Sequence, residues 1–203
     1  MLRIAVDIDN TLYDTERCTQ DVYDEANKAL ADMNTDAVYM HDLYNRVNKK
    51  LDAVETWFDP KYLILEAVAA LQALGTVAEL YICTARWVDL KYYDTLFKDT
   101  ALHFADIIQR DKYYGDKACA CMRTGIDVLI DDDTDNLLSH YALRRNSIEV
   151  YKTHFVLYTG HTTGDTELSA DYYREEHKDT VSVMSDWCNF EQIIERLGEK
   201  KHE

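Results

Sequence analysis

The chain of 203 residues is poor in basic side chains, with 22 Lys and Arg against 38 Asp and Glu and a formal net charge of −16. Proteins that bind nucleic acid polymers rely on clustered Lys and Arg to neutralise the phosphates. The shortage of basic residues therefore argues against a nucleic acid polymer as partner. A small anionic substrate stays compatible with this charge if a metal ion and a few placed cations reverse the field locally.

Long apolar runs and paired cysteine motifs are absent as well. No apolar stretch approaches the length of a membrane span, and the first expected strand begins at Leu2, which leaves no room for a signal or transit peptide. The five cysteines form no CxxC pair and no zinc-like spacing with histidine. We therefore expect a soluble cytoplasmic protein with reduced thiols and no membrane partner.

The segment from Leu2 to Tyr13 begins as an aliphatic run that is typical of a strand buried on both faces, as in the middle of a parallel sheet. The run ends at two carboxylates, Asp7 and Asp9. Ligands of open α/β sheets bind outside the carboxyl ends of the strands, so both carboxylates lie where a site is expected. Asp-x-Asp also occurs in ordinary turns, and the interpretation needs support from the rest of the chain.

Two later apolar runs end in polar groups of a similar kind. Thr84 and Arg86 follow the run that ends at Cys83, and Asp131, Asp132 and Asp133 follow the run that ends at Ile130. We expect strands at 77–83, 104–109, 127–130 and 181–184, one or two strands within 147–158, and helices at 63–74, 87–98, 117–123 and 189–197. Strands that alternate with helices predict an α/β fold with a doubly wound, parallel, Rossmann-like sheet.

Two apolar stripes of helical spacing lie between the first strand and its crossover helix. They consist of Val22, Ala26, Ala29, Leu30 and Met33, and of Leu43, Val47, Leu51, Val54 and Phe58. The single proline, Pro60, marks the return to the sheet, because the residue before a proline disfavours helix. We expect residues 1–14 and 60–203 to form the core domain and 15–59 a small helical cap inserted after the first strand. Residues 146–180 are expected to be an insertion in the core whose structure the pattern leaves open.

Taken in order, Asp7-Ile8-Asp9, Thr84-Ala85-Arg86, Lys117 and Asp131-Asp132 resemble the four motifs of the haloacid dehalogenase superfamily, over residues 1 to about 138. The resemblance implies a phosphomonoesterase that works through an aspartyl-phosphate. Phosphate monoesters resist hydrolysis because the leaving alkoxide is poor and the phosphoryl oxygens repel an anionic nucleophile. A catalyst must therefore neutralise charge, attack in line and protonate the leaving oxygen.

The same resemblance implies a role for each motif residue. Asp7 would be the nucleophile and Asp9 the acid and base, while Thr84 and Lys117 would contact the phosphoryl oxygens. Mg²⁺ would be the cofactor, since it prefers hard oxygen ligands.

The implied metal ligands are the Asp7 carboxylate, the Asp9 carbonyl and Asp131, with Asp132 as a second candidate, either as a ligand or as an outer group. Asp133 is an extra carboxylate without an assigned role, and an acid at a helix N-terminus is its plainer interpretation. Lys112 also follows an expected strand and is the alternative to Lys117 as the motif lysine. Arg86 is a candidate for substrate binding, with a surface position at a helix start as the alternative.

A narrower resemblance concerns 5′-nucleotidases of the deoxyribonucleotidase type. It rests on Trp57-Phe58-Asp59-Pro60, the runs 80–86 and 126–132, and Ser185-Asp186-Trp187 before a last helix. It implies nucleoside, above all deoxynucleoside, 5′-monophosphates as substrates, with cap aromatics that stack on the base. Trp57 is the candidate for this stacking, whereas Phe58 fits better as a core residue that completes the second stripe. Asn10 replaces the usual glycine, and the segment from about 146 to 179 is longer than that family needs.

Other functions fit the motifs less closely or equally well. The same chemistry could act on another small phosphate, of the sugar phosphate or phosphoglycolate type, because the motifs specify the reaction and not the leaving group. An inactive binding protein on the same scaffold is a second alternative. A dehalogenase does not need Asp9, and a membrane pump would need membrane spans. A homo-oligomer is left open.

Overall fold

The computed structural model describes residues 1–30, 36–75, 77–109, 116–146, 151–160 and 179–200. Within these residues a six-stranded parallel sheet has the order β3-β2-β1-β4-β5-β6. The strands are β1 (Leu2–Val6), β2 (Ala78–Thr84), β3 (Phe104–Gln109), β4 (Val128–Asp131), β5 (His154–Tyr158) and β6 (Val181–Met184). The predicted α/β class with a parallel, Rossmann-like sheet is confirmed.

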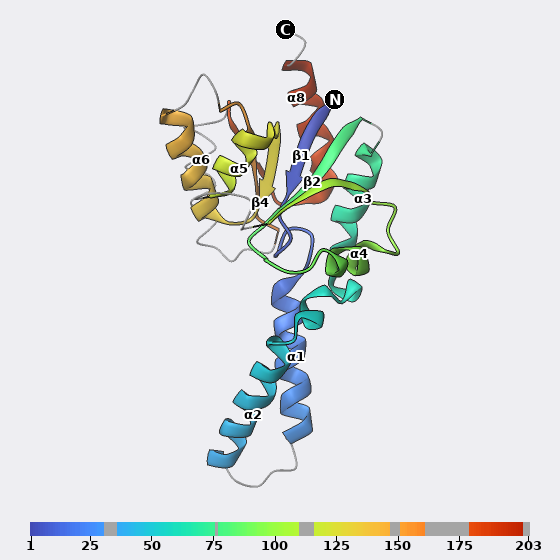
Figure 1. The fold of residues 1–203 in the computed structure, drawn as a ribbon, viewed down its shortest axis with the longest axis vertical. Helices are drawn as coiled ribbons and strands as arrows, with labels where there is room; N and C mark the ends of the chain where they lie inside the picture. The colour runs from blue at the N-terminus through green and yellow to red at the C-terminus, as the bar shows by residue number, and fades with distance from the viewer. Residues whose placement is uncertain (31–35, 76, 110–115, 147–150, 161–178, 201–203) are drawn as a thin grey trace.

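Helices cover both faces of the sheet (Figure 1). They are α3 (Leu65–Leu74), α4 (Lys91–Phe97), α5 (Lys117–Thr124), α6 (Thr134–Asn146) and α8 (Phe190–Lys200). Ile4 and Val6 of β1 pack into one hydrophobic cluster with side chains of α3 and α8, whereas Ala5 packs into a second cluster with side chains of α5 and α6. Successive side chains of a strand point to opposite faces, so the central strand is buried on both sides, as its aliphatic run predicts.

Two long helices, α1 (Thr15–Leu30) and α2 (Asp36–Leu51), extend away from the sheet as a hairpin (Figure 1). The 3₁₀ helices η1 (Val54–Phe58) and η2 (Pro60–Tyr62) lead the chain back to α3. Val22 and Ala26 of α1 pack against Val47 of α2, with Leu43 and Leu51 at the edge of this cluster. Part of each predicted stripe therefore joins the two helices, whereas Ala29 is exposed, Val54 packs against the large cluster and Met33 lies outside the described residues. The division of the chain into a core and a cap stays a prediction.

The prediction that Phe58 completes the α2 stripe is wrong. The helix ends at Leu51, and Phe58 belongs to η1, where it is buried in the large cluster beside the sheet. Its ring lies 5.4 Å from that of Tyr92 and 5.2 Å from that of Tyr93, measured between centroids. Because a 3₁₀ helix turns through three residues, the α-helical spacing does not continue past Leu51. Phe58 is thus a core residue, as expected, but of the cluster beside the sheet and not of the hairpin.

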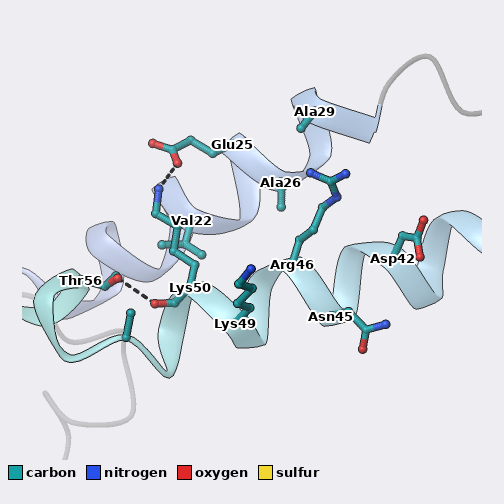
Figure 2. Close-up of a pocket in the computed structure, with 11 residues that line it drawn as sticks. Val22, Glu25, Ala26, Ala29, Asp42, Asn45, Arg46, Lys49, Lys50 and Thr56 are labelled. Carbon is teal, nitrogen blue, oxygen red and sulfur yellow. Dashed lines mark hydrogen bonds and ion pairs between the residues drawn. The ribbon is translucent and has the colours of Figure 1, made fainter.

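A cavity of about 800 Å³ opens between α1 and α2 (Figure 2). Val22 and Ala26 form an apolar part of its wall, and Lys50 bridges its rim through an ion pair with Glu25. Thr56 closes one end, where its hydroxyl donates to the Lys50 carbonyl at 2.7 Å. The lining residues, all of them from the described part of the chain, include no residue predicted for the site.

Most expected elements are present, with shifted ends. The helix expected from Trp87 begins only at Lys91, and β2 and β4 each begin and end one residue later than expected. The sequence indicates α6 only through Asp133, whose plainer interpretation is an acid at a helix N-terminus. The extent of the helix was not predicted, because its buried residues Leu137 and His140 do not form an extended stripe. Within 147–158 the described residues contain one strand, β5, while Lys112, 147–150 and 161–178 lie outside the described residues.

No helix in the described part of the chain is both long and apolar enough to span a bilayer.

Candidate active site

Asp7 and Asp9 lie at the carboxyl end of the central strand β1. The Asp7 N–H donates to the Ile130 carbonyl at 2.9 Å, so the chain stays beside β4 for one residue beyond the strand. The chain then folds back, with the Tyr13 N–H bound to the Ile8 carbonyl at 2.8 Å and Asn10 at a φ of 52°. Asparagine adopts this left-handed conformation more readily than most residues. The turn can therefore form with asparagine where glycine is usual.

Lys117 lies between two carboxylates. Its Nζ is 2.7 Å from Asp7 Oδ1 and 2.7 Å from Asp131 Oδ2, and all three side chains are buried. The Asp116 side chain caps α5 by accepting the Cys119 N–H at 2.8 Å, which makes Lys117 the first residue of the helix. Burial lowers the pKa of Lys117, but the charges of Asp131 and Asp7 outweigh this and hold the pKa above its usual range. The raised pKa favours the protonated form, so the Lys117 side chain carries a positive charge near the end of β1.

Three carboxylates meet in this place, since oxygens of Asp7, Asp131 and Asp132 lie within 4.8 Å of one another. Burial raises the pKa of Asp7; the Lys117 charge opposes the shift, and Asp131 and Asp9 add to it. Burial also raises the pKa of Asp132 to about 7, with a further contribution from Asp131. Ionised carboxylates held this close repel one another unless cations offset their charge. The cluster thus has the donor atoms and the excess negative charge that suit a hard divalent cation.

Thr84 is the last residue of β2, the neighbour of β1, and Arg86 lies two residues further along the chain. The register pairs Val6 with Ile82, which places Thr84 beside the segment that carries Asp7 and Asp9. Thr84 is buried, and its hydroxyl oxygen accepts the Arg86 N–H at 3.2 Å. The Arg86 guanidinium binds the Asp9 carboxylate, with Nη2 2.6 Å from Oδ1 and Nε 3.1 Å from Oδ2. Burial raises the pKa of Asp9, but the hydrogen bonds and charge of Arg86, together with a hydrogen bond from Thr15, leave it below its usual value.

A cavity of about 370 Å³ adjoins Asp9. Trp57 and Trp87 contribute aromatic surface to it, and Arg86 contributes its guanidinium. Trp87 is 75% exposed, whereas Trp57 is half-buried and its indole N–H donates to the Leu51 carbonyl at 2.7 Å. The structure thus brings Trp57, Arg86 and Asp9 to one cavity, whose lining does not include Asp7, Thr84 or Lys117.

The sequence did not single out three polar residues that bind site carboxylates. The Thr15 hydroxyl donates to Asp9 Oδ1 at 2.6 Å, and the Thr11 hydroxyl lies 3.4 Å from Asp132 Oδ1. The Asn136 amide donates to Asp131 Oδ1 at 3.1 Å. Thr11 lies within the first motif, and Asn136 lies shortly after the last one. This nearness to the motifs is the feature of the sequence that could have identified them as site residues. Thr15 reaches Asp9 only because the chain folds back after β1.

Asp133 lies at the N-terminus of α6, as the plainer interpretation of its sequence position predicts. Its Oδ1 accepts the Asp135 N–H at 2.8 Å in the first turn of α6, and its Oδ2 accepts the Asn136 amide at 3.2 Å. A carboxylate at a helix N-terminus satisfies free backbone donors and interacts favourably with the helix dipole. Asp133 therefore caps α6 and helps to orient Asn136, which in turn binds Asp131.

No protein-family model matches the chain, and no curated protein matches its sequence. Solved structures do share the fold. A hydrolase of the HAD superfamily, subfamily IA, from Geobacter sulfurreducens PCA aligns with a TM-score of 0.57 at 12% identity, over 95% of this chain and 96% of that chain. A 2-haloacid dehalogenase from Pseudomonas syringae pv. Tomato DC3000 aligns with a TM-score of 0.54 at 13% identity, over 97% and 99% of the two chains.

A third solved structure, described as a predicted phosphoglycolate phosphatase from Haemophilus somnus 129pt, aligns with a TM-score of 0.51 at 13% identity, over 94% and 96% of the two chains. At these identities the similarity establishes the fold alone. The sheet and its strand order define a Rossmann-like α/β protein. Its architecture is the one found in hydrolases of the haloacid dehalogenase superfamily.

Proposed function

We propose that the protein is a magnesium-dependent phosphomonoesterase of the haloacid dehalogenase type, and that its substrates are nucleoside 5′-monophosphates, deoxynucleoside forms above all. One observation carries the proposal. The Lys117 ammonium lies 2.7 Å from Asp7 and 2.7 Å from Asp131 in a buried cluster at the end of the central strand. This arrangement supports a nucleophilic carboxylate beside a fixed positive charge, which is what attack on a phosphate monoester requires.

The side chains divide the reaction between them. An Asp7 oxygen bonds to phosphorus while the bond from phosphorus to the leaving oxygen breaks, and Asp9 in its protonated form supplies the proton that the leaving oxygen takes. The Arg86 guanidinium favours the ionised carboxylate that remains after this transfer. Asp9 then removes a proton from the water that hydrolyses the aspartyl-phosphate. Thr84 donates a hydrogen bond to a phosphoryl oxygen, and Lys117 offsets negative charge on another.

The acidic cluster supports Mg²⁺ as the cofactor. Asp7, Asp131 and Asp132 offer three carboxylates, and Lys117 offsets part of their charge. These residues, with the Asp9 carbonyl, would hold the ion, which when bound supplies positive charge to the phosphoryl group. Asn136 donates to Asp131 and so orients one of the carboxylates.

The reaction is tested with a panel of phosphate monoesters, assayed with and without Mg²⁺. We expect turnover that depends on Mg²⁺ and is abolished in Asp7→Asn, a variant of nearly equal volume that lacks the nucleophile. Asp89→Asn is the control, because Asp89 is an exposed residue paired with Lys91. Retention of about a tenth of the wild-type rate by Asp7→Asn would contradict the covalent mechanism. If the wild-type protein turns over none of the esters, the hypothesis of an inactive binding protein is favoured instead.

The cavity beside Asp9 supports a leaving group with a flat ring, since Trp57 and Trp87 both line it. Stacking of a base on an aromatic side chain is worth about 1–3 kcal/mol. We expect Trp57→Ala to raise KM for a nucleoside monophosphate roughly ten-fold and to change KM for p-nitrophenyl phosphate much less. Trp57→Phe, which keeps a ring and loses the bond to Leu51, should retain most of the affinity. Equal losses on both substrates would assign Trp57 to the structure of η1.

A second substrate class is a small phosphate of the sugar phosphate or phosphoglycolate type. It is favoured by the polar part of the cavity lining, where Asp9, Thr15 and Asp52 suit a leaving group with several hydroxyls. The structural neighbour described as a predicted phosphoglycolate phosphatase is consistent with it. Turnover of these esters with no turnover of any nucleotide in the panel would decide for this class.

A further inference from the structure

Arg86, which lies between β2 and α4, makes more contacts than a substrate-binding residue requires. Two nitrogens bind the two Asp9 oxygens, at 2.6 and 3.1 Å, and Nη1 donates to the backbone carbonyl of Trp57. The side chain is only 11% exposed. A planar guanidinium fork that binds a carboxylate through two nitrogens restricts the position of both groups. The carboxylate of Asp9 is thereby tied to β2 on one side and to η1 on the other.

Two aromatic rings hold the guanidinium itself. Its central carbon lies 4.9 Å from the centre of the Tyr13 ring and 5.0 Å from that of the Phe58 ring. Tyr13 is fixed in turn, because its hydroxyl donates to the Thr56 carbonyl at 3.0 Å. Arginine stacks well on aromatic faces, so these contacts leave the fork little freedom.

A second bond reaches Asp9 from the other end of the hairpin. The Thr15 hydroxyl donates to Asp9 Oδ1 at 2.6 Å, and Thr15 is the first residue of α1. Trp57 lies in η1, where the chain returns from α2. The two connections of the hairpin therefore meet at one carboxylate, the first through Thr15 and the second through Arg86.

We propose that Arg86 is a positioning residue, which holds the Asp9 carboxyl group at the leaving oxygen and joins its orientation to the position of the α1–α2 hairpin. This rests on the proposed function, in which the proton leaves Asp9 for the leaving oxygen as the bond from phosphorus to that oxygen breaks. Arg86 takes no part in bond making and holds no proton that moves. Its effect on the reaction passes through Asp9.

A double-mutant cycle tests this, with kcat and KM measured for Arg86→Ala, Asp9→Asn and the double variant. The two substrates are an alkyl phosphate and p-nitrophenyl phosphate. The alkyl leaving group needs a proton from Asp9, whereas p-nitrophenolate is stable enough to leave without one. We expect Arg86→Ala to lower kcat roughly 10²-fold on the alkyl ester, less on the aryl ester, with little change in KM. In the Asp9→Asn background the same substitution should have almost no further effect on kcat, because residues that act as a unit are not additive.

Arg196→Ala in α8 is the matched control, since Arg196 binds only within its own helix among the described residues. Thr15→Val removes the other hydrogen bond to Asp9 and should show the same leaving-group dependence at smaller size. Circular dichroism shows whether Arg86→Ala folds. If it does not, Arg86→Lys replaces it in the cycle, because lysine keeps the positive charge but lacks the planar guanidinium fork.

Independent effects in the cycle, or equal loss of kcat on both esters, would overturn the proposal and leave Arg86 with a purely structural role. A rise in KM with unchanged kcat would also overturn it, by assigning Arg86 to substrate binding. These results need an active wild-type protein. They differ from the failure of the proposed function, in which the wild-type protein hydrolyses neither ester.

Discussion

At the scale of single residues, the positive charge of Lys117 is what allows Asp7 and Asp131 to lie together in a buried place. Both carboxylates bind the same ammonium at 2.7 Å. Removal of one partner of a buried ion pair leaves an uncompensated charge and commonly destabilises a protein by about 3–5 kcal/mol. The lysine therefore has a structural role at this site in addition to the role proposed in the reaction.

We expect Lys117→Ala to lower kcat by roughly 10²–10³-fold, the usual effect of losing one group that stabilises the transition-state charge. The same variant should unfold at a lower urea concentration than the wild-type protein, because Asp7 and Asp131 lose their shared cation. The measurements are kcat with p-nitrophenyl phosphate and equilibrium unfolding. Lys112→Ala is the comparison, since Lys112 is the alternative motif lysine. The reverse ranking of the two variants would move the third motif to Lys112.

At the scale of elements, the short helix η1 connects the hairpin to the sheet. It places the Trp57 carbonyl on Arg86 and buries Phe58 against Tyr92 and Tyr93 of α4. An α-helix in its place would turn these side chains in other directions, because its residues per turn differ. The 3₁₀ geometry of η1 is therefore what allows one segment to contact both the cavity and the core.

We expect Phe58→Ala to lower the free energy of unfolding by about 3–5 kcal/mol, the usual cost of deleting a buried phenyl ring. It also removes one of the two rings that hold Arg86. Urea unfolding measures the loss. Trp87→Ala is the control, because Trp87 is 75% exposed and surface substitutions change stability by about 0.5 kcal/mol or less. A similar small effect of Phe58→Ala would show that η1 does not anchor the hairpin.

At the scale of the whole molecule, the parallel sheet gathers groups that are far apart in the chain. Thr84 and Asp131 are the last residues of β2 and β4, and Asp7 directly follows β1, which lies between them. All three lie at the same edge because parallel strands end on one side. The gathered carboxylates are one source of the negative charge that a bound cation would offset. Binding of that cation and stability of the fold should therefore be linked.

We expect Mg²⁺ at a hundred times its Kd to stabilise the folded protein by about 2.7 kcal/mol, which raises Tm by roughly 5–10 °C for a chain of this size. Thermal unfolding measures the shift. In Asp131→Asn the shift should largely disappear, because a buried ligand is lost, whereas Asp89→Asn should keep it. An equal shift in Asp131→Asn and the wild-type protein would place the ion elsewhere.

The sequence by itself determined the sheet class, most strands and the edge of the sheet at which the candidate site residues lie. Aliphatic runs such as Ile4 to Val6 identify buried strands locally, and a parallel sheet then brings the residues after each strand to one edge. Asp7, Asp9, Thr84 and Asp131 could be chosen on that ground. Their catalytic roles came from resemblance and stay predictions.

Only the tertiary structure decided which side chains touch across the fold. Arg86 reaches Asp9 across 77 positions of the chain, and Thr15 reaches it because the segment after β1 folds back. Periodicity records which face of an element is buried and not which polar group lies opposite. The same limit explains Phe58, whose spacing matched the α2 stripe although the helix had already ended. Polar partners and helix ends depend on how elements cross in space, and that geometry exists only once the chain has folded.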